Sequence, residues 1–417
     1  MSSTSIKNIG IISTRIAGTD GVSLEISKWV DIFKRNNYNC FYFSGESDRE
    51  DSISYQIEEA HFAHPEIRAI SSRVFGNQTR SQDISEKIEI TTGKLKKSLY
   101  DFYNKYKLDL IIPENALTIP MNIPLGLAIT EFIAETGIPT IAHHHDFYWE
   151  RERFIINSCQ DYLNKAFPAD LPSIRHVTIN SIGSFQLSLR RGCSNTIVPN
   201  VYNFAEQPQQ PDLKAINELK NTIGLKQNEL FILQPTRIVP RKWIERAVEI
   251  VYNMKLNNPK LIISHESGDE GDEYFKNILE YSKNLGIQII TIDELITHEK
   301  SDNKKYSLID LYQSADLITY PSGYEGFGNA FLETVYYYKP IVVNRYSVFI
   351  ADIEPKGFDV ITMDGVVSKT VIENIYKILE NKERLLSMVE QNYQLAKKYF
   401  SYEMLEKKLM HIISTFD

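Results

Sequence analysis

The fold is decided by one stretch of the sequence, Pro321-Ser322-Gly323-Tyr324-Glu325-Gly326-Phe327-Gly328-Asn329-Ala330-Phe331-Leu332-Glu333. The apolar run Asp316–Tyr320 comes before it and is typical of a buried parallel strand. The segment 331–339 has the length of a helix and is stopped by Pro340, after which Ile341-Val342-Val343 predicts another buried strand. We therefore expect a strand, a glycine-rich turn, a helix and a strand in succession, which is the repeating unit of a parallel α/β sheet.

The turn in this unit has the composition of an anion-binding site. Gly326 and Gly328 allow the backbone to approach a ligand closely. Asn329 is expected to be the N-cap, so that free N–H groups of the following helical turn point toward a phosphate or a sugar hydroxyl. Glu325 and Glu333 are spaced so that both carboxylates could face one cleft. Taken alone, that spacing also fits an ordinary strand-to-helix turn with solvated acids.

The order of residues from Tyr324 to Glu333, followed by Lys339-Pro340-Ile341-Val342-Val343, resembles the donor-binding signature of the family 4 retaining glycosyltransferases. The resemblance extends over most of the chain and is weakest over 46–80. It implies an α/β fold of the GT-B type, with two Rossmann-like lobes, an interdomain cleft and a C-terminal helix that returns to the first lobe. It also implies retaining transfer of a hexose, with mannose or glucose favoured. The donor would be a GDP- or UDP-linked nucleotide sugar and the acceptor a small molecule or glycan, and no metal or other cofactor would be required.

The same resemblance assigns roles to residues of the second half of the chain. Glu333 would hold the ribose hydroxyls, and Glu325 would hold the sugar as one of the catalytic residues. Arg237 and Lys242 match an Arg-x4-Lys segment of the family and would stabilise the leaving diphosphate, a charge that such cations bind well. The backbone around the turn would complete the donor site through Gly326, Phe327, Gly328, Asn329 and Ala330.

The first βα connection of the chain is also rich in glycine. Asn8–Ser13 predicts a strand and 23–36 a helix, with Gly18 and Gly21 in the turn between them. The turn lacks G-x-G-x-x-G, so a dinucleotide-binding fingerprint is not supported. The resemblance places this turn at the cleft, with Gly21 toward the donor and Gly18 toward the acceptor. The alternative is a plain loop.

Three adjacent histidines, His143, His144 and His145, follow the predicted strand 138–142. On an extended backbone His143 and His145 point to one side and His144 to the other. A zinc site would need further ligands, and no Cys or His pair has a supporting spacing. The resemblance implies instead that His145, which precedes Asp146, lies beside the donor sugar as a catalytic residue.

An aromatic and charged segment comes directly after the histidines. Trp149 could stack on a sugar ring, while Arg151 and Arg153 could pair with a carboxylate or phosphate. We therefore assign Trp149, Arg151 and Arg153 to the acceptor side. A solvated helix start with local ion pairs is the alternative interpretation of the same residues.

The chain divides into three predicted parts. The segment 205–212, with its two Gln-Pro steps, is the best linker candidate, so we expect an acceptor-side domain over 1–204 and a nucleotide-sugar domain over 205–396. Residues 397–417 carry a long apolar side and are predicted to cross back to the first domain. We also expect an irregular insertion over 46–80, continuous helix over 383–414, and a solvated helix start in the acidic run 266–273.

Composition limits the class of protein. The chain has 417 residues and a formal net charge of -8, which suggests no nucleic acid partner and no general affinity for anionic membrane. Its three cysteines are far apart, which predicts free thiols in a reducing compartment. No apolar run approaches the ~18 residues of a membrane span, and the N-terminus has no signal-peptide core. We therefore expect a cytoplasmic protein, while local basic patches leave peripheral membrane contact open.

Two alternative functions share these features. A sugar phosphorylase or a nucleotide-sugar epimerase could use the same fold. A sugar-binding protein without catalysis could also have two lobes, although Arg237, Lys242 and Glu333 would then be unneeded.

Overall fold

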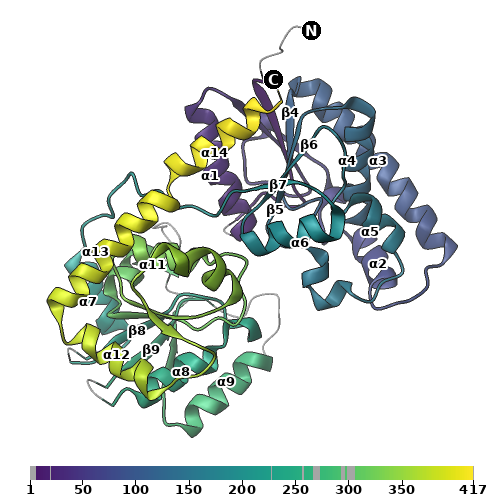
Figure 1. Ribbon diagram of the computed structural model, residues 1–417. Helices are drawn as coiled ribbons and strands as arrows, with labels where there is room; N and C mark the ends of the chain where they lie inside the picture. The colour runs from purple at the N-terminus through teal and green to yellow at the C-terminus, as the bar shows by residue number, and fades with distance from the viewer. Residues whose placement is uncertain are drawn as a thin grey trace. The chain divides into compact units, whose positions relative to one another are not determined.

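The computed structural model describes residues 6–18, 20–226, 228–255, 258–265, 273–292, 296–297 and 306–416. The chain forms two compact units, one made of residues 1–200 with 402–417 and the other of residues 201–401 (Figure 1). Each unit is built around its own parallel β-sheet covered by helices. This confirms the predicted α/β fold with two Rossmann-like lobes.

The first unit contains a sheet of seven strands in the order β3-β2-β1-β4-β5-β6-β7. Its strands are β1 (Asn8–Ile12), β2 (Asn39–Ser44), β3 (Ser54–Gln56), β4 (Leu110–Pro113), β5 (Thr140–His144), β6 (Ile174–Thr178) and β7 (Asn195–Ile197). Its helices are α1 (Gly21–Arg35), α2 (Pro65–Val74), α3 (Gln82–Tyr106), α4 (Ile123–Thr136), α5 (Gln160–Ala166), α6 (Ser181–Arg191) and α14 (Tyr402–Ser414). The strand order changes direction between β1 and β4, which are direct neighbours. Open α/β sheets bind ligands at the carboxyl ends of strands at such a switch point.

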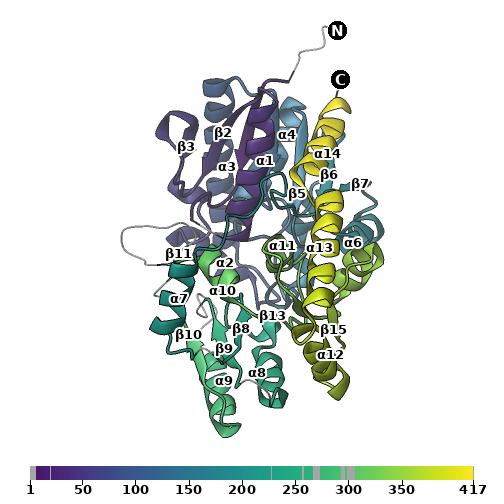
Figure 2. The ribbon, with the colours of Figure 1, turned by 90° about the vertical axis from the view of Figure 1, so that its left-hand side faces the viewer.

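Helices cover both faces of this sheet. The long helix α3 packs on α4, and together they bury Leu99 and Phe132 in a core shared with Ala142 of β5. The neighbouring His143 points to the opposite face, where Trp29 of α1 stacks on it with ring centroids 4.2 Å apart. The C-terminal helix α14 lies beside α1 (Figures 1 and 2). There Asn36 donates to Glu406 at 2.7 Å, so the last helix is part of the first unit.

The second unit contains a sheet of six strands in the order β10-β9-β8-β13-β14-β15. Its strands are β8 (Phe231–Gln234), β9 (Lys260–Ile263), β10 (Ile289–Thr291), β13 (Leu317–Tyr320), β14 (Ile341–Asn344) and β15 (Ile361–Met363), and β11 (Ile296–Thr297) pairs separately with β12 (Tyr306–Ser307). Its helices are α7 (Leu213–Thr222), α8 (Ile244–Asn253), α9 (Glu273–Asn284), α10 (Leu308–Ser314), α11 (Asn329–Tyr336), α12 (Lys369–Leu379) and α13 (Lys382–Tyr399). The switch point of this sheet lies between β8 and β13.

The structure departs from the expectations in several places. The unit boundaries fall at 200/201 and 401/402, a few residues from those expected at 204/205 and 396/397. The segment 46–80 is not an irregular insertion, because it supplies the edge strand β3 and helix α2. The expected continuous helix over 383–414 is interrupted, since the carbonyl of Phe400 accepts from the N–H of Tyr202 at 2.9 Å and Ser401 bridges to the same residue. The acidic residues 266–272 and Thr19 lie outside the described residues.

Candidate active site

The central feature of the second unit is an ion cluster at the switch point of its sheet. The loop after β13 carries Glu325, and the loop after β8 carries Arg241 and Lys242. Lys242 Nζ pairs with Glu325 Oε1, and Arg241 Nη1 lies 3.2 Å from Glu325 Oε2. Residues 83 positions apart in the sequence are therefore joined because β8 and β13 are neighbours. We call Arg241, Lys242 and Glu325 the Glu325 cluster.

Charge in this cluster is unbalanced. The side chains of Lys242 and Glu325 are only 10% and 8% exposed. Burial by itself would raise the pKa of Glu325, but the cations Lys242 and Arg241 hold that pKa below its ordinary value. Burial lowers the pKa of Lys242, which the Glu325 carboxylate partly offsets, and the exposed Arg237 is close enough to lower it further. Two cations thus pair with one carboxylate, a third cation lies near Lys242, and the excess positive charge suits a diphosphate.

Backbone contacts fix the two loops of the Glu325 cluster against each other. The N–H of Gly323 donates to the carbonyl of Arg241 at 2.9 Å. Trp243 follows Lys242 with a positive φ of 48° and places its indole ring against Gly323. A Cβ added at Gly323 would lie 2.4 Å from that ring, so only glycine fits there without displacement. The positions of Arg241 and Lys242 therefore depend on the Gly323–Trp243 contact.

The helix after the glycine-rich turn begins differently from the expectation. Gly328, with φ of 115°, is the N-cap of α11, so Asn329 is the first helical residue and not the cap. A Cβ at Gly328 would lie 2.6 Å from the hydroxyl of Tyr346, which donates to the carbonyl of Phe327 at 2.7 Å. The side chain of Phe327 packs on Phe400 in the core. Only the backbone of Phe327 is thus left for a ligand.

The remaining predicted donor residues lie on α11 or in the turn before it. Gly326 is half-buried between Glu325 and Phe327, and Ala330 is buried in the first turn of α11. Glu333 lies one turn into α11 and accepts from the hydroxyl of Tyr312 at 2.7 Å. Glu325 and Glu333 are therefore held by different partners.

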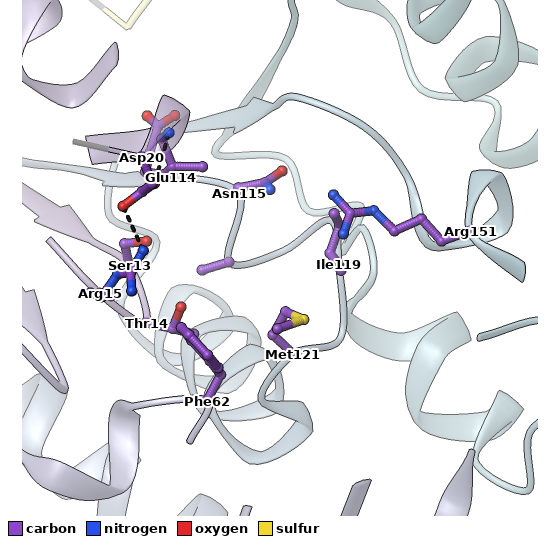
Figure 3. A pocket seen from close by; sticks show the side chains of 12 residues that line it. Ser13, Thr14, Arg15, Asp20, Phe62, Glu114, Asn115, Ile119, Met121 and Arg151 are labelled. Carbon is purple, nitrogen blue, oxygen red and sulfur yellow. Dashed lines mark hydrogen bonds and ion pairs between the residues drawn. The ribbon is translucent and has the colours of Figure 1, made fainter. Parts of the chain in front are cut away.

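The first unit has a pocket at its own switch point, between the ends of β1 and β4 (Figure 3). It has a volume of about 140 Å³ and is lined by Ser13, Thr14, Arg15, Asp20, Val22, Phe62, Glu114, Asn115, Ala116, Ile119, Met121 and Arg151. Arg15 and Arg151 lie on opposite sides of the pocket in Figure 3. Arg15 Nη2 is 2.9 Å from Asp20, and Arg151 Nε is 2.5 Å from Asp146. The lining thus presents two cations together with hydroxyl and amide groups.

One wall of this pocket is a buried carboxylate that holds two histidines. Glu114 Oε2 lies 3.0 Å from His143 Nδ1, and Glu114 Oε1 lies 2.5 Å from His145 Nε2. Burial would raise the pKa of Glu114, but the two imidazoles hold that pKa at about 2. Burial would likewise lower the pKa of His145, and the Glu114 carboxylate raises it above its ordinary value. His143 and His145 therefore point to the same side, as predicted for an extended segment.

The third histidine points the other way. His144 Nδ1 is 2.5 Å from Thr118 Oγ1, and His144 Nε2 is 2.9 Å from His176 Nδ1. Burial lowers the pKa of His144 well below its ordinary value. His144 is therefore a neutral, buried residue without access to the pocket.

The predicted acceptor residues do not all reach the pocket. Arg151 lines it, and the exposed Arg153 donates to the sulfur of Met121, a lining residue, at 2.8 Å. Trp149 is outside the lining, because it stacks on Phe147 with centroids 4.5 Å apart and donates to Gln186. Gly18 is exposed and donates its N–H to Asp48 at 2.8 Å.

The helix start at Gly21 is capped by the residue that precedes it. Gly21 is the first residue of α1, and the Asp20 carboxylate accepts from the N–H groups of Val22 and Ser23. The helix start that could attract an anion is thus already capped by a residue of the chain itself.

Most of the second unit matches the model of a known family. Residues 215–395 match the family model described as Glycosyl transferases group 1, and this range includes Arg237, Lys242, Glu325 and Glu333. Mannosylglucosylglycerate synthase of Thermotoga maritima is 28% identical, with 95% of this chain and 97% of that protein covered. Mannosylglucosylglycerate synthase of Petrotoga mobilis is 29% identical, with 97% of this chain and 96% of that protein covered. The chain is a glycosyltransferase.

Solved structures agree with this glycosyltransferase in fold. A glycosyltransferase from Rickettsia africae superposes with a TM-score of 0.72 at 14% identity, covering 99% of this chain and 98% of that one. Anabaena HepE in complex with UDP-glucose superposes with a TM-score of 0.66 at 12% identity, covering 98% and 99%. Both cover essentially the whole length, so the likeness includes the two Rossmann-like lobes.

Several residues of the glycosyltransferase were not predicted from the sequence. Arg15 lies three residues after the last residue of β1, and that position was the one local signal that could have singled it out. Arg241 is adjacent to the predicted Lys242, but its pairing with Glu325 depends on the β8–β13 contact. No helix among the described ranges is both long enough and apolar enough to span a membrane.

Proposed function

We propose that this glycosyltransferase transfers a hexose, with mannose favoured, from a nucleoside diphosphate sugar to a hydroxyl of a glycosylated glycerate. The two relatives aligned over nearly their whole length are both named mannosylglucosylglycerate synthase. A product of that name contains a mannosyl unit, a glucosyl unit and a glycerate. The corresponding acceptor would be a glucosylglycerate, which carries hydroxyls and one carboxylate.

The observation that carries the proposal is the excess of positive charge around Glu325. When the bond between the sugar C1 and the diphosphate oxygen breaks, negative charge develops on the leaving diphosphate. Arg237, Arg241 and Lys242 would stabilise that charge, and such preorganised groups typically supply the largest part of catalysis. Glu325 would accept hydrogen bonds from the sugar hydroxyls, and the backbone around Gly328 would approach the donor closely.

The proposed reaction proceeds with retention at C1. The acceptor oxygen forms its bond to C1 on the face from which the diphosphate leaves, and the acceptor proton passes to the departing phosphate oxygen. No side chain has to act as a general base in this scheme. The resemblance to family 4 enzymes and the cation excess support it, and neither requires a metal ion on the diphosphate.

The pocket of the first unit is the proposed site for the glycerate end of the acceptor. Arg15 and Arg151 each pair with one aspartate, and a guanidinium has more N–H donors than one such contact uses. Both could therefore also bind a carboxylate placed between them. Ser13, Thr14 and Asn115 would serve the neighbouring hydroxyls. Glucosylglycerate should then be a better acceptor than a glucoside without a carboxylate.

The test is a turnover assay with a panel of donors and acceptors. The purified enzyme is incubated with GDP-mannose, GDP-glucose, UDP-glucose or UDP-galactose together with glucosylglycerate or with methyl glucoside. We expect a product one hexose heavier by mass spectrometry, α-linked by NMR if the donor is an α-linked nucleotide sugar. Donor alone and donor with inorganic phosphate are the matched controls. Conversion of donor alone would indicate an epimerase, and conversion that requires phosphate would indicate a phosphorylase.

Chelation tests how the diphosphate is held. Because cations of the chain would balance its charge, turnover should persist when EDTA is added in excess. Loss of activity that Mg²⁺ or Mn²⁺ restores would contradict the proposed role of Arg237 and Lys242. A variant lacking Glu325 should bind nucleoside diphosphate but lose affinity for the sugar part of the donor.

A further inference from the structure

A second group of side chains in the first unit has no part in the proposed reaction. Asp170 lies in the loop before β6, His176 lies in β6, and Cys193 lies between α6 and β7. Each offers one possible metal-ligand atom, and these atoms lie within 4.8 Å of one another. His176 and Cys193 are each 4% exposed, whereas Asp170 is exposed. We call these three residues the Cys193 cluster.

The Cys193 cluster contains a buried nitrogen that lacks a hydrogen bond. His176 Nδ1 is engaged with His144 Nε2 at 2.9 Å, which leaves Nε2 as the ring nitrogen available to the cluster. His176 Nε2 is buried and has no hydrogen-bond partner in the part of the chain that the structure describes. A buried polar atom without a partner is costly to folding, so its retention calls for an explanation.

A chain of hydrogen bonds sets the protonation of this nitrogen. Both rings are buried, and His176 Nδ1 and His144 Nε2 share one hydrogen bond at 2.9 Å. When a cation takes the Nε2 lone pair, His176 Nδ1–H donates to His144 Nε2, and His144 Nδ1–H donates to Thr118 Oγ1. Every ring proton then has an acceptor. Metal-binding histidines characteristically donate their other N–H in this way, which fixes the tautomer and the ring orientation.

The other His-containing cluster of the first unit differs in this respect. In Glu114, His143 and His145, the carboxylate oxygens already accept hydrogen bonds from the two imidazoles. A metal ion would have to break those hydrogen bonds. In the Cys193 cluster it would instead bind the His176 Nε2 lone pair, which has no partner within the described ranges, so the Cys193 cluster is the better candidate.

We propose that Asp170, His176 and Cys193 bind one Zn²⁺ ion, with water as the fourth ligand. One imidazole, one thiolate and one carboxylate are ligands that zinc accepts, and two anionic ligands balance its charge. Bond lengths of 2.0–2.3 Å place tetrahedral ligand atoms roughly 3.5 Å apart. The exposed Asp170 can make the required approach, because it lies in a loop. The side chain of Arg191 is a nearby cation that interacts electrostatically with His176 and Cys193. It also donates hydrogen bonds to the carbonyls of Asn164 and Pro168.

The zinc ion would have a structural role and would take no part in the bond-forming step of the proposed transferase reaction. It would tie the α6–β7 connection to β6, and through His144 it would hold Thr118. Thr118 belongs to the β4–α4 loop, whose residues Asn115, Ala116 and Ile119 line the pocket of Figure 3. Zinc occupancy would thus stiffen that wall of the pocket and raise the melting temperature.

The test uses the full chain without a histidine tag. Zinc is removed by dialysis against chelator, and the protein is titrated with Co²⁺ while the absorption spectrum is recorded. We expect one equivalent of Co²⁺ to bind with tetrahedral visible bands and a thiolate-to-cobalt charge-transfer band. Cys193→Ser should lose the charge-transfer band, whereas Cys159→Ser, which removes a buried thiol elsewhere in the same unit, should keep it.

A second variant tests metal binding with a substitution that should leave folding intact. Because Asp170 is exposed, Asp170→Asn should melt like the metal-free wild type, yet bind Co²⁺ at least tenfold more weakly. Zn²⁺ should raise the melting temperature of the wild type and not that of Asp170→Asn. Absence of the thiolate band in the wild type, or its persistence in Cys193→Ser, would overturn the proposal. Neither outcome bears on sugar transfer, which the turnover assay measures separately.

Discussion

Replacement of Glu114 by glutamine removes the negative charge between two histidines and keeps the size of the side chain. In the wild type this carboxylate is 1% exposed and bonded to His143 and His145. Glutamine can keep only part of these hydrogen bonds and cannot compensate a protonated imidazole. We therefore expect the variant to fold with a lower free energy of unfolding.

The pKa of Glu114 sets the size of this loss. The folded state lowers that pKa from the ordinary 4.5 to about 2, although burial alone would raise it. At 1.36 kcal/mol per pKa unit, the carboxylate contributes roughly 3 kcal/mol at neutral pH. For a unit of about 200 residues that corresponds to a fall in melting temperature of roughly 6–12 °C.

The pH dependence has a definite sign. Because the folded pKa of Glu114 is depressed, its contribution is complete above about 4.5 and is lost as the pH falls toward 2. Because the folded pKa of His145 is raised, its contribution is complete below 6.5 and is lost as the pH rises through that raised value. Both pKa shifts arise from the same ion pair, between Glu114 and His145. The difference between wild type and Glu114→Gln should therefore be widest between pH 4.5 and 6.5.

The assay is urea unfolding of wild type and variant at a series of pH values, followed by circular dichroism. Glu131→Gln is the matched control, because Glu131 also contacts two cations, Lys96 and Lys165, but near the surface. Surface pairs contribute about 0–1 kcal/mol, so the control should change little. A difference for Glu114→Gln below 1 kcal/mol, or one that does not vary with pH, would refute the reasoning.

Three further predictions concern the proposed reaction. Arg237→Ala and Lys242→Ala should each lower kcat by about 10²-fold or more, the usual cost of removing a transition-state stabiliser. Wild-type turnover with an unchanged melting temperature would contradict their assignment to the leaving diphosphate. Arg151→Ala should raise KM for glucosylglycerate and leave donor hydrolysis unchanged, so weaker donor binding without acceptor would contradict the acceptor role of the pocket. Gly323→Ala should displace the Trp243 ring, lower the free energy of unfolding by about 1–3 kcal/mol and reduce kcat. A melting curve and turnover like those of wild type would show that the loops after β8 and β13 adjust freely.

Much of the fold follows from local sequence patterns. Buried strands have continuous apolar runs, and the buried apolar residues of α3 recur at helical spacing, and both signals need only neighbouring residues. The start of α11 could not be predicted in this way. It depends on Gly328 at φ of 115°, a conformation fixed by the packing of Tyr320 and Tyr346 around it. The break between α13 and α14 likewise depends on Tyr202, far away in the chain.

The candidate site was predicted only in part. The signature around Glu325 and the pair Arg237 and Lys242 are local motifs with a characteristic spacing, so they could be proposed from the sequence. The role of Arg15 was not, because its partner across the pocket, Arg151, is 136 positions away. Trp149 shows the opposite case, since its aromatic ring suggested a substrate contact but packs on Phe147.

The sequence by itself determined the alternation of strands and helices, the glycine-rich turn, and the side on which each of the three histidines lies. These properties follow from side-chain volume, glycine content and the two-residue period of an extended chain. Only the tertiary structure decided that Lys242 pairs with Glu325 and that His176 Nε2 has no partner among the described residues. Those contacts depend on strand order, which brings distant segments together at a switch point and which no local pattern encodes.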